Sequence, residues 1–149
     1  MHSSHQNGLD ADVAYLRMNR VERNPDLWGT KGFEESFVAN GKVTKNFDLK
    51  RNWFLLREVV SNGNVSRIFV GPEIKRAFCN ASTRIDPTLK AEYRTEILRR
   101  LRPYPNHDDH FHLRVKCPPN NERCESQVEP PEGSSCDKID SVSFDEHEL

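Results

Sequence analysis

Histidines and aspartates are concentrated in one short stretch of this sequence, Asn106–His112. Three of the six histidines and two carboxylates lie within it, and the residues that follow, Leu113–Val115, have the pattern of a β-strand. Side chains two residues apart on a strand point to the same face, so we expect His110 and His112 to point together, with His107 just ahead of the strand. Imidazole with carboxylate is a typical ligand set for a divalent metal, most often zinc. A solvated, histidine-rich turn is the alternative.

A second stretch, near the start of the chain, strengthens the metal hypothesis. Leu9–Leu16 alternates in part between apolar and acidic positions, which predicts a strand with Asp10 and Asp12 on one face. A carboxylate in a strand bound for the core is costly unless it is paired or bound to a metal. His5 precedes this strand across a turn at Gly8. Two histidines and an aspartate from two strands would leave one coordination position open, as in catalytic zinc sites.

These two strands need a scaffold, and the rest of the sequence predicts a mixture of helices and strands. Asp48 is placed to cap a helix over residues 49–61, and Asn40-Gly41 between short apolar runs is typical of a hairpin turn. Further helices are expected over residues 72–79 and 87–100, and a buried strand over residues 65–70. We therefore expect an α+β fold, with a small antiparallel sheet that carries the metal site and helices on its other side.

Composition limits the classes of function. A length of 149 residues allows one domain with a modest core, and the net charge of -1 lacks the basic excess of a nucleic-acid surface. We therefore expect no nucleic-acid partner. No apolar run approaches the roughly 20 residues of a membrane span, so no membrane span is expected. We expect the domain to cover residues 1–137 and an acidic, disordered tail to cover residues 138–149.

Cysteine usage points to an oxidising compartment. The four cysteines, at positions 79, 117, 124 and 136, form no Cys-x-x-Cys motif, and three of them lie in a proline-rich end of the chain. An even number of cysteines in such a region favours disulfides over a thiolate metal site, and three pairings are compatible with the residues alone. Four reduced thiols in a cytosolic protein are the alternative. We expect the cysteines to form an irregular, cross-linked cap after the histidine strand.

The motifs together resemble a known family. The pattern Ser-x-His-x-x-Gly-x-x-x-Asp over Ser3–Asp12, with the distant His110-x-His112, resembles the signature of lysostaphin-type peptidases and D-alanyl-D-alanine carboxypeptidases. The similarity to the penicillin-insensitive murein endopeptidase family is closer and extends from about Ser3 to Cys136. It is carried by Ser4–Asp12, Arg67–Val70, Arg102–Tyr104, His107–Arg114, Cys117–Pro119 and Cys124.

The resemblance implies a role for each candidate residue. It implies that His5, Asp12 and His112 hold one Zn²⁺, that His110 is the general base, and that His107 orients the substrate or stabilises the oxyanion. The choice between His110 and His112 as ligand comes from the resemblance, because spacing does not distinguish them.

Three further carboxylates are candidates to orient the imidazoles by hydrogen bonds: Asp10, Asp108 and Asp109. Plain surface positions explain Asp108 and Asp109 equally well. For Asp10 this explanation is weaker, because Asp10 should share a strand face with Asp12.

The resemblance also implies the disulfides Cys79–Cys136 and Cys117–Cys124 and a periplasmic location. Family members carry a signal peptide and further N-terminal structure, so we expect that residues 1–137 form a metallopeptidase catalytic domain without its N-terminal part. No signal peptide is visible in the polar first residues.

The implied substrate is the set of peptide cross-links of peptidoglycan, cut between D-alanine and meso-diaminopimelate by a zinc-dependent endopeptidase. A D,D-carboxypeptidase with the same signature is one alternative. A metal-stabilised, non-catalytic cell-wall binding module is the other, and it belongs to a different class of protein.

Overall fold

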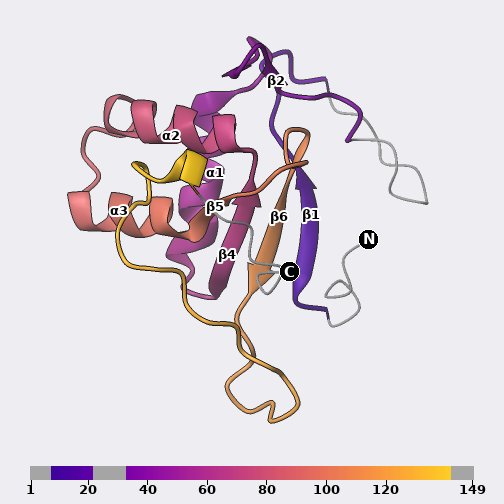
Figure 1. The fold of residues 1–149 in the computed structure, drawn as a ribbon, viewed down its shortest axis with the longest axis vertical. Helices are drawn as coiled ribbons and strands as arrows, with labels where there is room; N and C mark the ends of the chain where they lie inside the picture. Colours follow the sequence, from indigo (N-terminus) through magenta and orange to yellow (C-terminus); the bar gives the residue numbers. More distant parts are fainter. Residues whose placement is uncertain (1–7, 22–32, 142–149) are drawn as a thin grey trace.

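A computed structural model of the protein describes residues 8–21 and 33–141, and these residues form three α-helices beside a four-stranded sheet (Figure 1). The helices span Leu49–Ser61 (α1), Pro72–Ile85 (α2) and Ala91–Arg100 (α3). The strands span Asp10–Ala14 (β1), Val38–Ala39 (β2), Lys42–Val43 (β3), Val65–Val70 (β4), Leu101–Pro103 (β5) and His110–Val115 (β6), and a one-turn 3-10 helix (η2) covers Ile139–Ser141.

The main sheet has the strand order β1-β6-β4-β5. β6 pairs antiparallel with both β1 and β4, and β5 adds a parallel strand at the edge beside β4. The α+β class predicted from the sequence is confirmed, and the sheet is mixed because of β5. β2 and β3 form the predicted hairpin, in which Asn40 and Gly41 have φ angles of 51° and 70°. Both angles are those of the tight turn that Asn-Gly favours.

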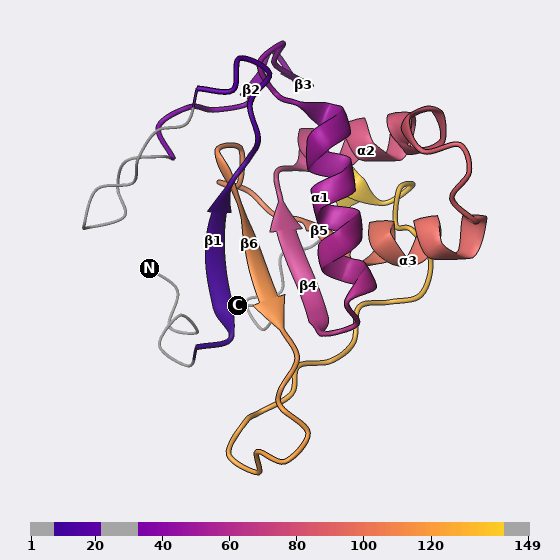
Figure 2. The ribbon, with the colours of Figure 1, turned by 180° about the vertical axis from the view of Figure 1, so that it is seen from behind.

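All three helices lie toward the β4–β5 side of the sheet, and β1 is the strand farthest from them (Figures 1 and 2). The core contains apolar side chains from the helices and from one face of the strands: Trp53, Leu56, Ile68, Val70, Phe78, Ile97, Leu101 and Phe111. Because side chains alternate along a strand, the neighbours of these residues occupy the opposite face. That face carries Phe69 on β4 and His112 on β6, which are directly paired.

Helix α1 begins and ends where the sequence predicts. The Asp48 side chain accepts a hydrogen bond from the backbone N–H of Arg51 at 2.9 Å, which caps the first turn. Helix α2 extends beyond its predicted end at Cys79 to Ile85. Its apolar face continues through Ala81, which is buried, so packing against the core stabilises the additional turns.

Helix α3 begins at Ala91, four residues later than predicted. The helix predicted over residues 87–100 begins directly after Asp86. In the structure the Asp86 carboxylate instead accepts hydrogen bonds from the side chains of Trp53 at 3.2 Å and Arg57 at 3.1 Å, both on α1. Asp86 therefore connects two helices, and the residues after it form a turn.

Both disulfides implied by the resemblance are present. Cys117–Cys124 closes a loop after β6, and this loop projects from the end of the sheet opposite the β2–β3 hairpin (Figure 1). Cys79–Cys136 joins the C-terminal segment to α2 across 57 residues of sequence. The two bonds confirm the cross-linked cap.

The ordered chain extends past the predicted boundary at residue 137. Ile139 is buried, and Asp140 forms an ion pair with Arg76 of α2 at 2.6 Å. The tail prediction for residues 142–149 falls outside the described residues. Among residues 8–21 and 33–141, no helix combines the length and apolar character that crossing a membrane requires.

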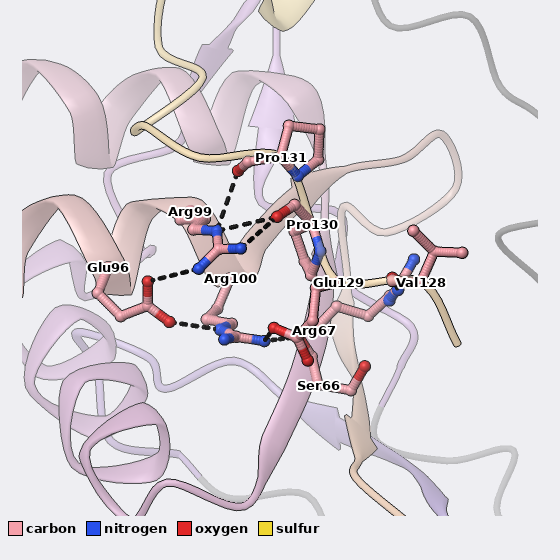
Figure 3. Close-up of polar contacts among 9 residues, drawn as sticks. All are labelled: Ser66, Arg67, Glu96, Arg99, Arg100, Val128, Glu129, Pro130 and Pro131. Carbon is pink, nitrogen blue, oxygen red and sulfur yellow. Dashed lines mark hydrogen bonds and ion pairs between the residues drawn. The ribbon is translucent and has the colours of Figure 1, made fainter. Parts of the chain in front are cut away.

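Residues 128–136, which we call the strap, follow the Cys117–Cys124 loop in the chain and end at Cys136, which is bonded to α2. Figure 3 shows how arginines contact the start of the strap. Arg99 donates hydrogen bonds from Nε to the carbonyls of Pro130 and Pro131, at 2.9 and 3.0 Å, and Arg67 donates to the carbonyl of Val128. Arg100 adds an ion pair with the side chain of Glu129 at 2.7 Å, so the start of the strap is attached through three main-chain carbonyls and one carboxylate.

A buried lysine holds the end of the strap. The Lys75 side chain is fully buried on α2, where its Nζ donates to the carbonyl of Ser134 at 2.7 Å and to that of Leu98 on α3. Burial and, to a smaller extent, the positive charge of Arg102 together lower the pKa of Lys75 from 10.5 to about 7.

Candidate functional site

The two acidic and histidine-rich stretches identified in the sequence become neighbouring strands, although about 100 residues separate them. β1 and β6 lie side by side (Figure 1), with Asp12 directly opposite His112 and Ala14 opposite His110. All four residues are on the face of the sheet away from the helical core, because every second side chain on a strand points the same way.

His112 lies between two carboxylates. Its Nδ1 is 3.1 Å from Oδ1 of Asp12, and its Nε2 is 2.8 Å from Oδ1 of Asp10. The imidazole is almost completely buried and packs edge-on against the ring of Phe69. Because a carboxylate only accepts hydrogen bonds, the bond to Asp10 places a hydrogen on Nε2, and Nδ1, which faces Asp12, is the nitrogen available to a metal.

Asp10 is buried with His112 and accepts a second hydrogen bond, from Nε of Arg114 at 2.7 Å. Burial by itself raises the pKa of Asp10, but the hydrogen bonds from Arg114 and His112 outweigh it, so the pKa is below its usual value. Asp10 therefore remains a carboxylate next to the imidazole. This position fits the orienting role considered for it from the sequence.

His110 is partly exposed beside this pair. Its Nδ1 is 2.6 Å from Oδ1 of Asp109, and its Nε2 is 3.7 Å from Oδ1 of Asp12. The bond to Asp109 leaves the lone pair of the neutral ring on Nε2, on the side of Asp12. The ring of Phe33 lies 5.1 Å from that of His110 and forms an apolar wall next to it.

His107 lies close to both other histidines, with its ring centre 5.0 Å from that of His110 and 6.2 Å from that of His112. Its own main-chain carbonyl accepts hydrogen bonds from the hydroxyl of Tyr15 at 3.1 Å and from the backbone N–H of Gly71 at 2.9 Å. Three segments of the chain therefore meet at His107 and determine its position.

Asp108 packs against Gly71. A Cβ atom at Gly71 would lie 2.4 Å from Oδ1 of Asp108 and 3.1 Å from the main-chain oxygen of His107, so a larger residue at position 71 would displace the Asp108 side chain. Burial raises the pKa of Asp108, and the charges of Glu73 and Asp109 raise it further. The orienting role and the surface position considered for Asp108 from the sequence both stay predictions, and the structure adds its contact with Gly71.

Sequence reasoning missed Arg114, Tyr15 and Gly71. Alternation could have revealed Arg114, because it is two residues after His112 on the same strand face. Tyr15 and Gly71 gave no local signal, because both reach His107 from distant parts of the chain.

The donors present fit part of a zinc site. Two ligands of one tetrahedral zinc, each about 2.0 Å from the metal, are roughly 3.3 Å apart, and Nδ1 of His112 and Oδ1 of Asp12 are 3.1 Å apart. The bond from Nε2 to Asp10 is of the type that metal-binding histidines make through their second nitrogen. The remaining predicted ligand, His5, lies outside the described residues. Within residues 8–21 and 33–141, no three His, Cys, Asp or Glu side chains converge on one metal position.

Known proteins provide independent evidence. The family described as "Penicillin-insensitive murein endopeptidase" matches residues 1–148. Proteins with that name from Escherichia coli and Haemophilus influenzae are each 32% identical to this chain over 136 and 140 residues. A third, from Pectobacterium atrosepticum, is 31% identical over 145 residues.

Each of these alignments covers 91% of this chain but only 44–46% of the relative, so the chain spans less than half the length of these proteins. The match nevertheless includes both strands of the site and both disulfides. The chain therefore belongs to the penicillin-insensitive murein endopeptidase family.

Proposed function

We propose that this chain is the catalytic part of a zinc-dependent murein endopeptidase that hydrolyses D-alanyl-meso-diaminopimelate cross-links of peptidoglycan. The observation that carries the proposal is the contact between Nδ1 of the buried His112 and Oδ1 of the partly exposed Asp12, two zinc-type donors from strands far apart in the sequence. Family membership and the names of the relatives support the substrate.

His112 and Asp12 would hold the metal together with His5. When bound, zinc at this position supplies a Lewis acid for the substrate carbonyl and makes the attacking water more acidic. His110 is suited to remove a proton from that water, because Asp109 orients its ring and leaves the lone pair of Nε2 beside Asp12. His107 would orient the substrate or, when protonated, stabilise the developing oxyanion.

This chemistry uses no serine nucleophile, so a β-lactam would find no activated hydroxyl to acylate. The names of the relatives include insensitivity to penicillin, which agrees with such a mechanism. The two disulfides support a location in an oxidising compartment, and we propose the periplasm.

The test is turnover of a purified, cross-linked muropeptide dimer by the oxidised protein, with and without added Zn²⁺. We expect zinc-dependent conversion of dimer to monomer. The variants His112→Ala and Asp12→Asn should each reduce the rate by ~10³-fold or more, since loss of a metal ligand removes several kcal/mol of transition-state stabilisation. Asp140→Asn is the matched control, because this exposed carboxylate pairs with Arg76 on α2 and should leave the rate unchanged.

The products separate the alternatives. Release of free D-alanine from dimers that stay intact would identify a D,D-carboxypeptidase. Stoichiometric zinc binding that depends on His112 without any turnover would indicate a cell-wall binding module. Absence of zinc binding would refute the metal site itself.

A further inference from the structure

Three buried side chains form a continuous row across β1 and β6 beside the candidate metal ligands. The side chains of Asp10, His112 and Arg114 are 1%, 2% and 5% exposed. One oxygen, Oδ1 of Asp10, accepts from both Nε2 of His112 at 2.8 Å and Nε of Arg114 at 2.7 Å. The strand register creates this row, because Asp10 lies opposite Arg114 and His112 is the next residue on the same face of β6.

The shared oxygen makes the geometry of His112 depend on Arg114. Asp10 can rotate about its side-chain bonds, and only one orientation brings Oδ1 within reach of the imidazole nitrogen. The guanidinium of Arg114 is planar and presents Nε–H in a fixed direction, so it selects that orientation. A lysine at this position would carry its charge at the end of a flexible chain and could not reproduce the donor.

We infer that Arg114 is a positioning residue that acts through Asp10 to hold His112 with its hydrogen on Nε2 and with Nδ1 directed at Asp12. The metal-binding consequence rests on the proposed function, whereas the effect on the imidazole does not. In a neutral ring, the nitrogen that binds a metal must be the one without hydrogen. Arg114 therefore prepares Nδ1 as a ligand without touching the metal or the substrate.

Arg114→Lys tests this inference with two measurements. The first is zinc affinity, measured by competition with a chromophoric chelator. We expect about 10-fold weaker binding for Arg114→Lys and 10- to 100-fold weaker binding for Asp10→Asn, the range typical for residues that orient metal ligands. The second is the ¹⁵N NMR shifts of the His112 ring in the metal-free protein. In the parent protein Nε2 should carry a hydrogen in all molecules, because Asp10 accepts from it, and both variants should lose this hydrogen in part.

Arg100→Lys is the matched control. Arg100 is another buried arginine, at the end of α3, bonded to Glu96 at 2.6 Å, Glu129 at 2.7 Å and the Ser66 carbonyl of β4 at 2.9 Å, and it has no contact with Asp10 among the bonds of the described residues. Its replacement should lower stability, while zinc affinity and the His112 tautomer should not change. A merely structural role for Arg114 would give the same result in Arg114→Lys.

The inference is overturned if Arg114→Lys folds normally and keeps both the parent zinc affinity and a single Nε2–H tautomer. Should Arg114→Lys fail to fold, as judged by circular dichroism, Asp10→Asn decides the question by the same two measurements. If the parent protein binds no zinc, the proposed function fails, but the tautomer comparison still decides whether Arg114 positions His112.

Discussion

The β1–β6 face and the strap both use cationic side chains, but the acceptors differ. On the β1–β6 face, Arg114 and His112 donate to a carboxylate, that of Asp10. At the strap, Arg99 and Lys75 donate to main-chain carbonyls. A side-chain pair depends on the identity of both residues, whereas a carbonyl is present whatever the residue. The site should therefore be sensitive to substitution on both sides. The strap should be sensitive at the cations that hold it, at Glu129, which pairs with Arg100, and at Cys136, but tolerant at its other side chains.

Removing Cys79–Cys136 is the largest expected perturbation of the strap. The double variant Cys79→Ser, Cys136→Ser opens a loop of 57 residues and should lower the free energy of unfolding by about 4 kcal/mol, because the unfolded chain gains conformational freedom. Urea unfolding measures this loss. The zinc affinity of the protein that remains folded should stay unchanged, since the Asp12–His112 contact is made by β1 and β6.

The second disulfide is the control for that loss. Cys117–Cys124 closes only 7 residues, so its removal should cost about 2 kcal/mol. A loss of zinc affinity in the folded Cys79→Ser, Cys136→Ser protein would contradict the independence of the two regions.

Lys75 should make the stability of the strap depend on pH. Its pKa is about 7 in the folded protein and near 10.5 when exposed, so between these values the unfolded chain binds more protons and stability rises with pH. The slope is at most ~1.4 kcal/mol per pH unit. The free energy of unfolding of the parent minus that of Lys75→Met, both measured in urea, should increase from pH 7 to pH 10, because only the parent gains stability over this range. A difference that stays constant or shrinks would mean that Lys75 keeps its charge when buried.

The smallest expected effects come from single substitutions at the strap, one of a residue that donates through its side chain and one of a residue that accepts through its main chain. Arg99→Ala removes the donor to two carbonyls and should cost about 1–2 kcal/mol of stability. Val128→Ala should cost less than about 0.5 kcal/mol, because Arg67 bonds to the Val128 carbonyl and the side chain is 87% exposed. Thermal unfolding compares the two. Equal costs would show that the side chains of the strap matter as much as its main chain.

Local patterns in the sequence were sufficient for several elements. Asp48 caps α1 and Asn40-Gly41 forms the hairpin turn, because both depend on backbone geometry within a few residues. Alternation likewise put Asp10 and Asp12 on one face of β1, and His110 and His112 on one face of β6. The sequence predicted helix boundaries less accurately where they depend on packing. Helix α2, for example, continues to Ile85, beyond its predicted end at Cys79.

The sequence by itself determined which residue types could carry chemistry and which face of each strand they occupy, since a period of two is a property of the strand alone. Only the tertiary structure decided that β1 pairs with β6 so that Asp12 meets His112, and that Arg114 meets Asp10 in the same register. Register depends on how the whole sheet buries its apolar face. Most contacts of the strap also depend on the tertiary structure, because their acceptors are main-chain carbonyls, which every residue possesses.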